Sequence, residues 1–284
     1  MLDPAVGHPS DISAAHHLTR AGSAGSERSY AGDQELAPAG HDFHATMESM
    51  PDYRAIEHEI REILGSDRWP VSVAYLDSPP AGIEKFSGSE PSSCSFWRLA
   101  AAGRVFYTVP ADHFNCPVGG YTHNTLTPEK MPELNDVLKL MTNIGYIRME
   151  EIPGVFQLLV GPKFVLYAPL AETPVAPSVV LASGKPGRVM MLAEAANRAG
   201  AMSKLPLLGR PTCMALPAAI QQGAVTSAGC IGNRVYTDIG EDELYVVLRG
   251  ADLERIAAEI PTIDSANRAL TGYHQDRRQA LSHL

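Results

Sequence analysis

The sequence has 284 residues, of which 45 % are hydrophobic and 19 % are charged. This balance is typical of a globular protein with one large domain or two ordinary ones, and it excludes a disordered or fibrous chain. The net charge of -9 argues against nucleic acid and anionic membrane surfaces as partners. Because we find neither an apolar run of about 18 residues nor a secretory signal pattern, we expect a cytoplasmic protein without a membrane-spanning segment.

The first 47 residues differ in composition from the rest of the chain. They are rich in Gly, Ala, Ser and His and show no sustained hydrophobic period, which predicts a disordered tail. Half of the chain's histidines lie in this tail, and loose metal binding is the alternative interpretation of them: His8, His16, His17, His41 and His44. We expect residues 48–284 to form a single domain.

Hydrophobic periodicity predicts alternating helices and strands in the first part of that domain. Residues 50–65 have the pattern of an amphipathic helix that ends at Gly65, and residues 69–80 contain an alternating strand. The further elements expected are a helix over 92–103, a strand over 104–110, an amphipathic helix over 127–145, and a hairpin over 156–170 that turns at Gly161-Pro162.

The second part repeats this order. We predict a strand over 177–182, helices over 187–200 and 213–223, a strand over 243–250 and a helical end over 251–281. The alternation indicates an α/β fold, with mixed α+β as the other possibility.

Two segments of the chain resemble each other. Each begins with a cysteine (Cys94, Cys213), continues through an alanine-containing helix, and reaches a second cysteine followed by a glycine and a Tyr-Thr pair (Cys116, Cys230). We therefore predict two similar halves, at about 70–150 and 160–260, related by a pseudo-two-fold axis within one compact domain. If equivalent loops meet at the axis, all four cysteines converge on one pocket.

These motifs resemble a known family. The spacing Cys-x5-Ala-x2-Gly from Cys94, the CPxGG turn at Cys116, the later Cys and Gly-Cys, and the Arg-x-Tyr-Thr from Arg234 are similar to those of the ArCR-type family of uncharacterised bacterial and archaeal proteins, domain of unknown function one hundred and sixty-nine. The resemblance covers roughly Tyr53 to Ile260. It implies no reaction.

The four cysteines favour an iron–sulfur cluster over structural zinc. Thiolates are soft ligands, and zinc knuckles use CxxC pairs, which this chain lacks. Because a cluster tolerates dispersed ligands, we predict that it is bound by all four cysteines: Cys94, Cys116, Cys213 and Cys230. These residues would then be the cofactor and metal ligands of an enzyme that acts on a small molecule by redox or Lewis-acid chemistry, an oxidoreductase or lyase. Because Cys94 lies at a predicted helix start, we expect the helix dipole to lower the pKa of its thiol.

Two alternatives stay open. In one, Cys116 is a nucleophile with His113 or His123 as base; in the other, the cysteines only pack in the core of a non-catalytic small-molecule binding module. As catalytic residues on the substrate side we predict His113, Asp112 and Arg234, with Arg98, Arg104 and Arg210 as further cations for an anionic substrate. No nucleotide-cofactor motif occurs, and homo-oligomer formation is expected only from size.

Overall fold

The computed structural model describes residues 50–281, apart from the side chains of residues 204–206. The predicted tail over residues 1–47 and its five histidines lie outside the described residues. The helices are α1 (Tyr53–Leu64), α2 (Ser95–Ala101), α3 (Pro117–Thr122), α4 (Met131–Asn143), α5 (Pro186–Arg198), α6 (Ala215–Gln222), α7 (Ile231–Thr237) and α8 (Leu253–Leu281). The strands are β1 (Val71–Leu76), β2 (Phe106–Thr108), β3 (Phe164–Pro169), β4 (Val179–Gly184), β5 (Met202–Leu208), β6 (Ala224–Ser227) and β7 (Leu244–Arg249).

All of these strands belong to one sheet in the order β2-β3-β1-β4-β7-β6-β5. Every neighbouring pair is antiparallel except β5 and β6, which run parallel. The fold is therefore mixed α/β with a mostly antiparallel sheet, so the broader class predicted from the alternation is confirmed.

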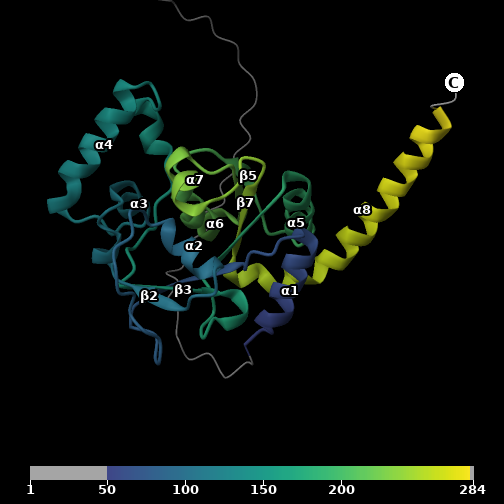
Figure 1. Ribbon diagram of the computed structural model, residues 1–284, viewed down its shortest axis with the longest axis horizontal. Helices are drawn as coiled ribbons and strands as arrows, with labels where there is room; N and C mark the ends of the chain where they lie inside the picture. Colours follow the sequence, from purple (N-terminus) through teal and green to yellow (C-terminus); the bar gives the residue numbers. More distant parts are fainter. Residues whose placement is uncertain (1–49, 282–284) are drawn as a thin grey trace, which may run out of the picture. The chain divides into compact units, whose positions relative to one another are not determined.

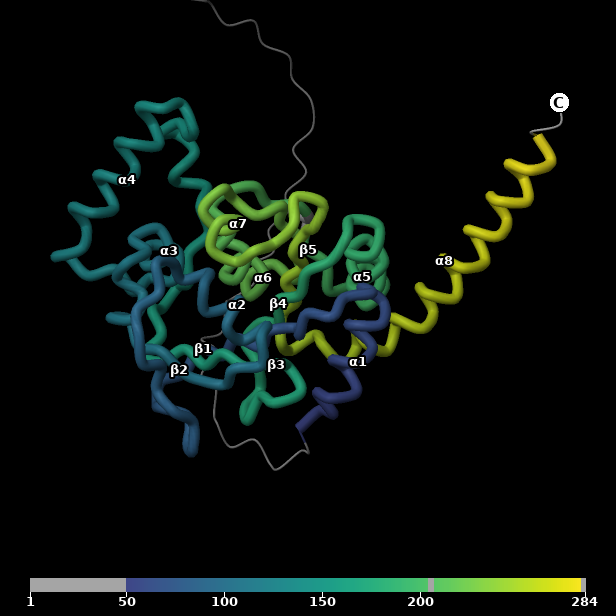
Figure 2. The backbone as a smooth tube through the Cα atoms, viewed as in Figure 1, coloured from purple at the N-terminus to yellow at the C-terminus, as the bar shows by residue number. Residues whose placement is uncertain are grey.

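Helices cover both faces of the sheet because side chains alternate along each strand. On one face Val71 and Val73 of β1 share a buried cluster with Phe96 of α2 and Leu216 of α6. On the other face α1, α5 and α8 pack together over a second cluster, as Figures 1 and 2 show. Its members include Ile60, Val180, Leu192 and Ile256.

The N-terminal helix shows how local signals set the ends of an element. The Asp52 side chain accepts a hydrogen bond from the Ala55 amide at 3.0 Å and so caps α1. Gly65 ends the helix in the left-handed region, with φ of 58°. Between these ends Ile56, Ile60, Ile63 and other apolar residues are buried, as the period predicted.

The predicted hairpin over 156–170 is wrong in its first arm. Only β3 forms, and its partners are β1 and β2. Leu159 and Val160 are 85 % and 80 % exposed, and the Leu158 amide donates to the carbonyl of Thr122, at the end of α3, rather than to a strand. The apolar run looked strand-like, but tertiary contacts hold it against a helix.

The loops around Cys116 and Cys230, predicted as glycine turns, each open a short helix. Cys116 is the N-cap residue of α3, where Pro117 takes the first helical position that suits proline. Cys230 is the N-cap residue of α7. Strands β5 and β6 were also missed, because their short apolar runs lie next to stronger helical patterns.

A long excursion separates α3 from β3. Residues 123–163 contain α4 and two 3-10 turns, and Figure 1 shows α4 standing at the edge of the helices that cover this face of the sheet. Only Leu134 of α4 is buried. None of the helices in the described part of the chain has the length and apolar character needed to cross a membrane.

Candidate functional site

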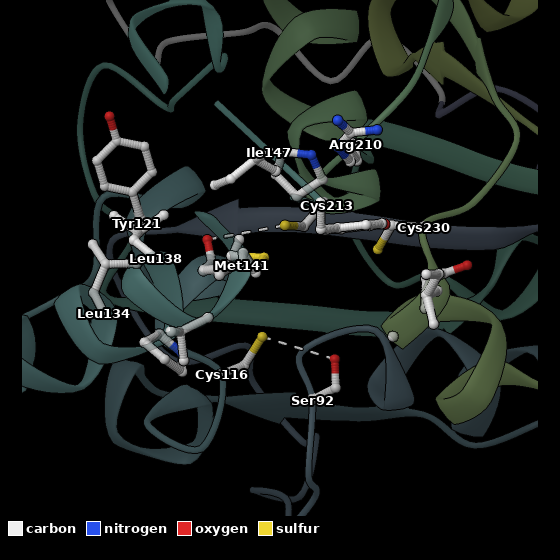
Figure 3. Close-up of a pocket in the computed structure, with 18 of the residues that line it drawn as sticks. Ser92, Cys116, Tyr121, Leu134, Leu138, Met141, Ile147, Arg210, Cys213 and Cys230 are labelled. Atoms are coloured by element: carbon white, nitrogen blue, oxygen red, sulfur yellow. Dashed lines mark hydrogen bonds between the residues drawn. The ribbon is translucent and has the colours of Figure 1, made fainter. Parts of the chain in front are cut away.

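A cavity of about 450 Å³ lies between α4 and the starts of α3, α6 and α7. All four cysteines of the chain line it: Cys94, Cys116, Cys213 and Cys230. Figure 3 shows three of them with the α4 side chains Leu134, Leu138 and Met141 across the space. Its volume is within the range of ordinary small-molecule sites.

The first two cysteines come from neighbouring helix starts. Cys94 is buried at the N-cap of α2, where its amide donates to Ser92 Oγ at 3.3 Å. Cys116 is half-buried, and its Sγ accepts a hydrogen bond from the Gly119 amide at 3.4 Å. Ser92 Oγ lies 3.8 Å from the same sulfur, so Ser92 links the two cysteine segments.

The other two come from the second part of the chain. Cys213 is buried in the 3-10 turn Thr212–Met214 that leads into α6, and its thiol lies 4.0 Å from the Val118 carbonyl oxygen. Cys230 is half-buried, and its amide donates to the Thr212 hydroxyl. The Thr212 contact ties the starts of α6 and α7 together as Ser92 does for α2 and α3.

The buried thiols are neutral at ordinary pH. Burial raises the pKa of Cys94, and Cys116 and Cys230 raise it further by repulsion. Burial likewise raises the pKa of Cys213, with added repulsion from the other three cysteines. The lowered pKa predicted for Cys94 from its helix start is therefore wrong, because loss of solvation outweighs the helix dipole.

Several buried polar atoms near the cysteines have no hydrogen-bond partner. Both amide ends of Asn233, which lines the cavity and is 2 % exposed, are unpartnered. The hydroxyls of Tyr75 and Tyr167 are unpartnered as well. Burial raises the pKa of Tyr167, and Cys94 and Cys116 add to this effect, which places its hydroxyl in their field.

His113 does not line the cavity. It is buried beneath it, where one ring nitrogen lies 2.8 Å from Thr108 Oγ1 and the other 3.0 Å from Ser93 Oγ. Burial, with a smaller effect of His123, lowers its pKa to about 3. The predicted position of His113 on the substrate side is corrected: its ring nitrogens are already bonded inside the core.

Asp112 also points away from the cavity. Its carboxylate accepts the Val109 amide at 2.8 Å and lies 3.5 Å from Lys85 Nζ, so it caps a 3-10 turn. His123, the other candidate base, is buried, and its Nδ1 lies 3.0 Å from the Gly119 carbonyl oxygen. Its Nε2 is unpartnered, and burial lowers its pKa to about 4.

Arg234 has a structural position rather than the predicted substrate-facing one. Its guanidinium donates to the carbonyls of Ala228, Gly240 and Glu243, and so closes the loop around α7. Of the other arginines, Arg210 lines the cavity, where its guanidinium lies 4.7 Å from the Tyr146 ring centre. Arg98 and Arg104 do not line it.

Within residues 50–281, no group of three or more His, Cys, Asp or Glu side chains is arranged to hold a single metal ion. A cluster is larger than one ion and its ligands stand farther apart, so this finding leaves a cluster untested.

Sequence patterns do not identify three buried polar residues near the cysteines, of which only Asn233 lines the cavity. Tyr75 was counted only as an apolar strand position, Tyr167 lay inside the predicted hairpin, and Asn233 sits in a glycine-rich stretch without a pattern. A signal existed for Asn233 alone, since it lies three residues after Cys230, one helical turn away.

Comparison with known proteins agrees with the resemblance in the motifs. No curated protein and no solved structure matches the chain. A family model described as uncharacterised ArCR, a domain of unknown function, matches residues 59–259 and spans all four cysteines. The chain therefore belongs to that family.

Proposed function

We propose that the four cysteines hold an iron–sulfur cluster and that the cavity beside them binds a small-molecule substrate. One observation carries this proposal: the entire cysteine complement, drawn from four separate helix starts, lines a single cavity. Free cysteines packed only as small apolar residues have no reason to share one opening.

The chemistry of the donor set fits a cluster. Thiolates are the usual ligands of iron–sulfur centres, and each thiol here lies in the electrostatic field of others. Burial and mutual repulsion oppose ionisation of Cys94 and Cys213, and coordination to iron removes that cost. The unpartnered donors of Asn233 and Tyr167 fit as well, because cluster sulfurs accept hydrogen bonds.

When bound, such a cluster supplies electron transfer or, with one iron open, Lewis-acid activation of a substrate oxygen. The chain's own residues supply the remaining functions. The apolar side chains of α4 form the outer side of the cavity, and the Asn233 amide offers a donor and an acceptor for orienting a substrate. His113 stays neutral and supports the wall through Ser93 and Thr108.

We also propose that the site arose from two similar halves related by a pseudo-two-fold axis. The strand order β2-β3-β1-β4-β7-β6 reads the same from either end if β1 corresponds to β4, β3 to β7 and β2 to β6. The central antiparallel pair β1–β4 has Val71 opposite Leu181 and Val73 opposite Val179, a register that a two-fold at Ser72 and Val180 maps onto itself.

Register and spacing support this correspondence. Thr108 is fourteen positions after Cys94, and Ser227 is fourteen positions after Cys213. Thr108 pairs with Val165, and Ser227 pairs with Tyr245, at equivalent positions of β3 and β7. These pairings put β3 in the first half, so the proposed halves are residues 71–172 and 179–252 rather than 70–150 and 160–260.

The cluster proposal is tested on the full chain by anaerobic reconstitution with ferrous iron and sulfide. We expect a brown protein that retains iron and acid-labile sulfide in equal amounts. Cys213→Ser should reduce the retained iron, because Cys213 is buried in the cavity wall. The matched control is Ser95→Ala, which changes a buried side chain on α2 that does not line the cavity. A wild-type protein that retains neither iron nor sulfide overturns the proposal.

The same preparation examines the thiol-enzyme alternative. The amide of Gly119 donates to Cys116 Sγ, a contact that supports a thiolate. Within residues 50–281 no histidine lines the cavity, so the cavity wall offers Cys116 no histidine base. Colourless protein that loses activity on alkylation of Cys116 alone favours the nucleophile.

A further inference from the structure

The outer wall of the cavity is an apolar surface that the rest of residues 50–281 covers only in part. Six apolar side chains of α4 and the segment after it line the cavity and stay partly exposed: Val137, Leu138, Met141, Ile144, Ile147 and Ile152. Ile144 is 67 % exposed although it lines the cavity. On the opposite side Ile231 of α7 is 65 % exposed. An apolar occupant between them would remove this surface from water, at roughly 25 cal/mol for each Å².

The inner end of the same cavity contains one buried amide that lacks partners. Asn233 is 2 % exposed, and neither its Nδ2 nor its Oδ1 has a hydrogen-bond partner. Its polar neighbours are the Cys94 thiol and the Tyr245 hydroxyl, which lie near enough for Asn233 to lower the pKa of both although no hydrogen bond of ordinary geometry is formed. A buried amide without partners has lost its bonds to water, and a ligand group with both an acceptor and a donor replaces them.

The charges in the cavity wall cancel. Arg210 and Glu151 both line the cavity, and their charged groups lie 3.3 Å apart. No other Lys, Arg, Asp or Glu occurs among the lining residues of the described chain. A phosphate or other dianion would therefore enter an apolar space without a free cation, which is unfavourable.

From these three features we infer that the cavity binds a predominantly hydrocarbon molecule with one uncharged carbonyl-type head group. The head group bonds to Asn233 among the four cysteines, and the hydrocarbon part lies against α4 and Ile231. The assignment of this molecule as substrate rests on the proposed function, whereas its binding requires only the cavity and Asn233.

The experiment uses prodan, a neutral naphthalene ketone whose fluorescence shifts to shorter wavelength in apolar surroundings. We expect saturable binding to the full chain, and displacement by decanamide at least about tenfold better than by decyl phosphate, a difference of about 1.4 kcal/mol. Absence of saturable prodan binding, or stronger displacement by decyl phosphate, overturns the inference.

Two variant pairs locate the ligand. Leu138→Arg should weaken prodan binding at least about tenfold, whereas Leu140→Arg, on the same helix but outside the cavity lining, should leave it within about twofold. Asn233→Leu should weaken decanamide binding about tenfold, and Asn143→Leu on the exposed end of α4 should not. Equal effects within either pair contradict the assignment, and thermal melts confirm that the variants fold.

The two proposals fail separately in this design. Titrations are made on the protein before and after anaerobic loading with iron and sulfide. Prodan and decanamide binding without retained iron refutes the cluster and keeps the ligand class. Retained iron without saturable prodan binding refutes the ligand class and keeps the cluster.

Discussion

Two connections in this protein join a cysteine-capped helix to the next strand, and they differ greatly in length. From α7 to β7 the chain needs only residues 238–243, whereas from α3 to β3 it makes the excursion over residues 123–163 that contains α4. Apart from the excursion, the strands that follow both helices hold equivalent places in the sheet.

The two regions also differ in how deeply their side chains are buried. The cysteines stand on helices that are packed into the sheet, where Phe96 and Leu216 are fully buried. Of α4 only Leu134 is buried, and the half-buried Val137, Leu138 and Met141 line the cavity beside it. In our proposals the well-packed inner wall holds the cysteines, and the less buried outer wall provides the apolar surface for a ligand.

The largest effect should come from truncating the inner wall. Leu216→Ala removes a fully buried side chain of α6, and we expect a loss of about 2–5 kcal/mol in the free energy of unfolding. Leu138→Ala on α4 should cost less than about 1 kcal/mol, because its side chain is only half-buried. Urea unfolding measures both. Similar losses would mean that α4 is as much a part of the core as α6.

Gly119 tests how closely the two cysteine segments of the first half are packed. A Cβ at this position would stand 2.5 Å from Ser93 Oγ and 3.0 Å from Cys116 Sγ. Ser93 is held by His113, so we expect Gly119→Ala to lower stability by about 1–3 kcal/mol and to disturb Cys116. The control is Gly187→Ala in α5, where an added Cβ meets nothing within 4 Å. Equal thermal midpoints for the two variants would contradict this packing.

Because of the buried histidines, we expect the free energy of unfolding to depend on pH. Burial lowers the pKa of His113 to about 3 and that of His123 to about 4, against about 6.5 in the unfolded chain. As pH falls below about 6.5 the unfolded chain binds protons that the folded chain does not, so stability decreases until the folded pKa is reached. At pH 5 the loss should be about 1–2 kcal/mol for each histidine.

Urea unfolding at pH 7.5 and pH 5 measures this loss. His113→Gln should show a smaller decrease than the wild type, since Gln does not titrate. His58→Gln, at an exposed position of α1, should show the wild-type decrease. If the His113 variant keeps the full decrease, His113 is not the group that resists protonation.

The smallest predicted effect separates the cysteines by their depth. Cys116 and Cys230 are half-buried, whereas Cys94 and Cys213 are buried and have raised thiol pKa values. Iodoacetamide should label the first two at least about tenfold faster, because the thiolate is the reactive form. Mass spectrometry of peptides from protein labelled for increasing times gives the four rates. Fast labelling of Cys213 would show that the outer wall opens widely.

Sequence patterns predicted the elements whose signals are local. The hydrophobic periods of α1, α4 and α5 and the Asp52 cap of α1 are complete within their own segments, and the matching cysteine spacings indicated that distant loops belong to one site. The hairpin over 156–170 failed because Leu158 bonds to α3, a partner that no local pattern can specify.

The sequence by itself determined the mixed α/β class, the family and the four cysteines as the residues of interest. Only the tertiary structure decided which polar neighbours face them. It turned His113 into the core toward Ser93 and Thr108, used Arg234 to bond loop carbonyls, and left the Asn233 amide unpartnered in the cavity. The physical reason is that a side chain's direction and burial depend on packing between segments distant in sequence, whereas residue type and spacing are fixed along the chain.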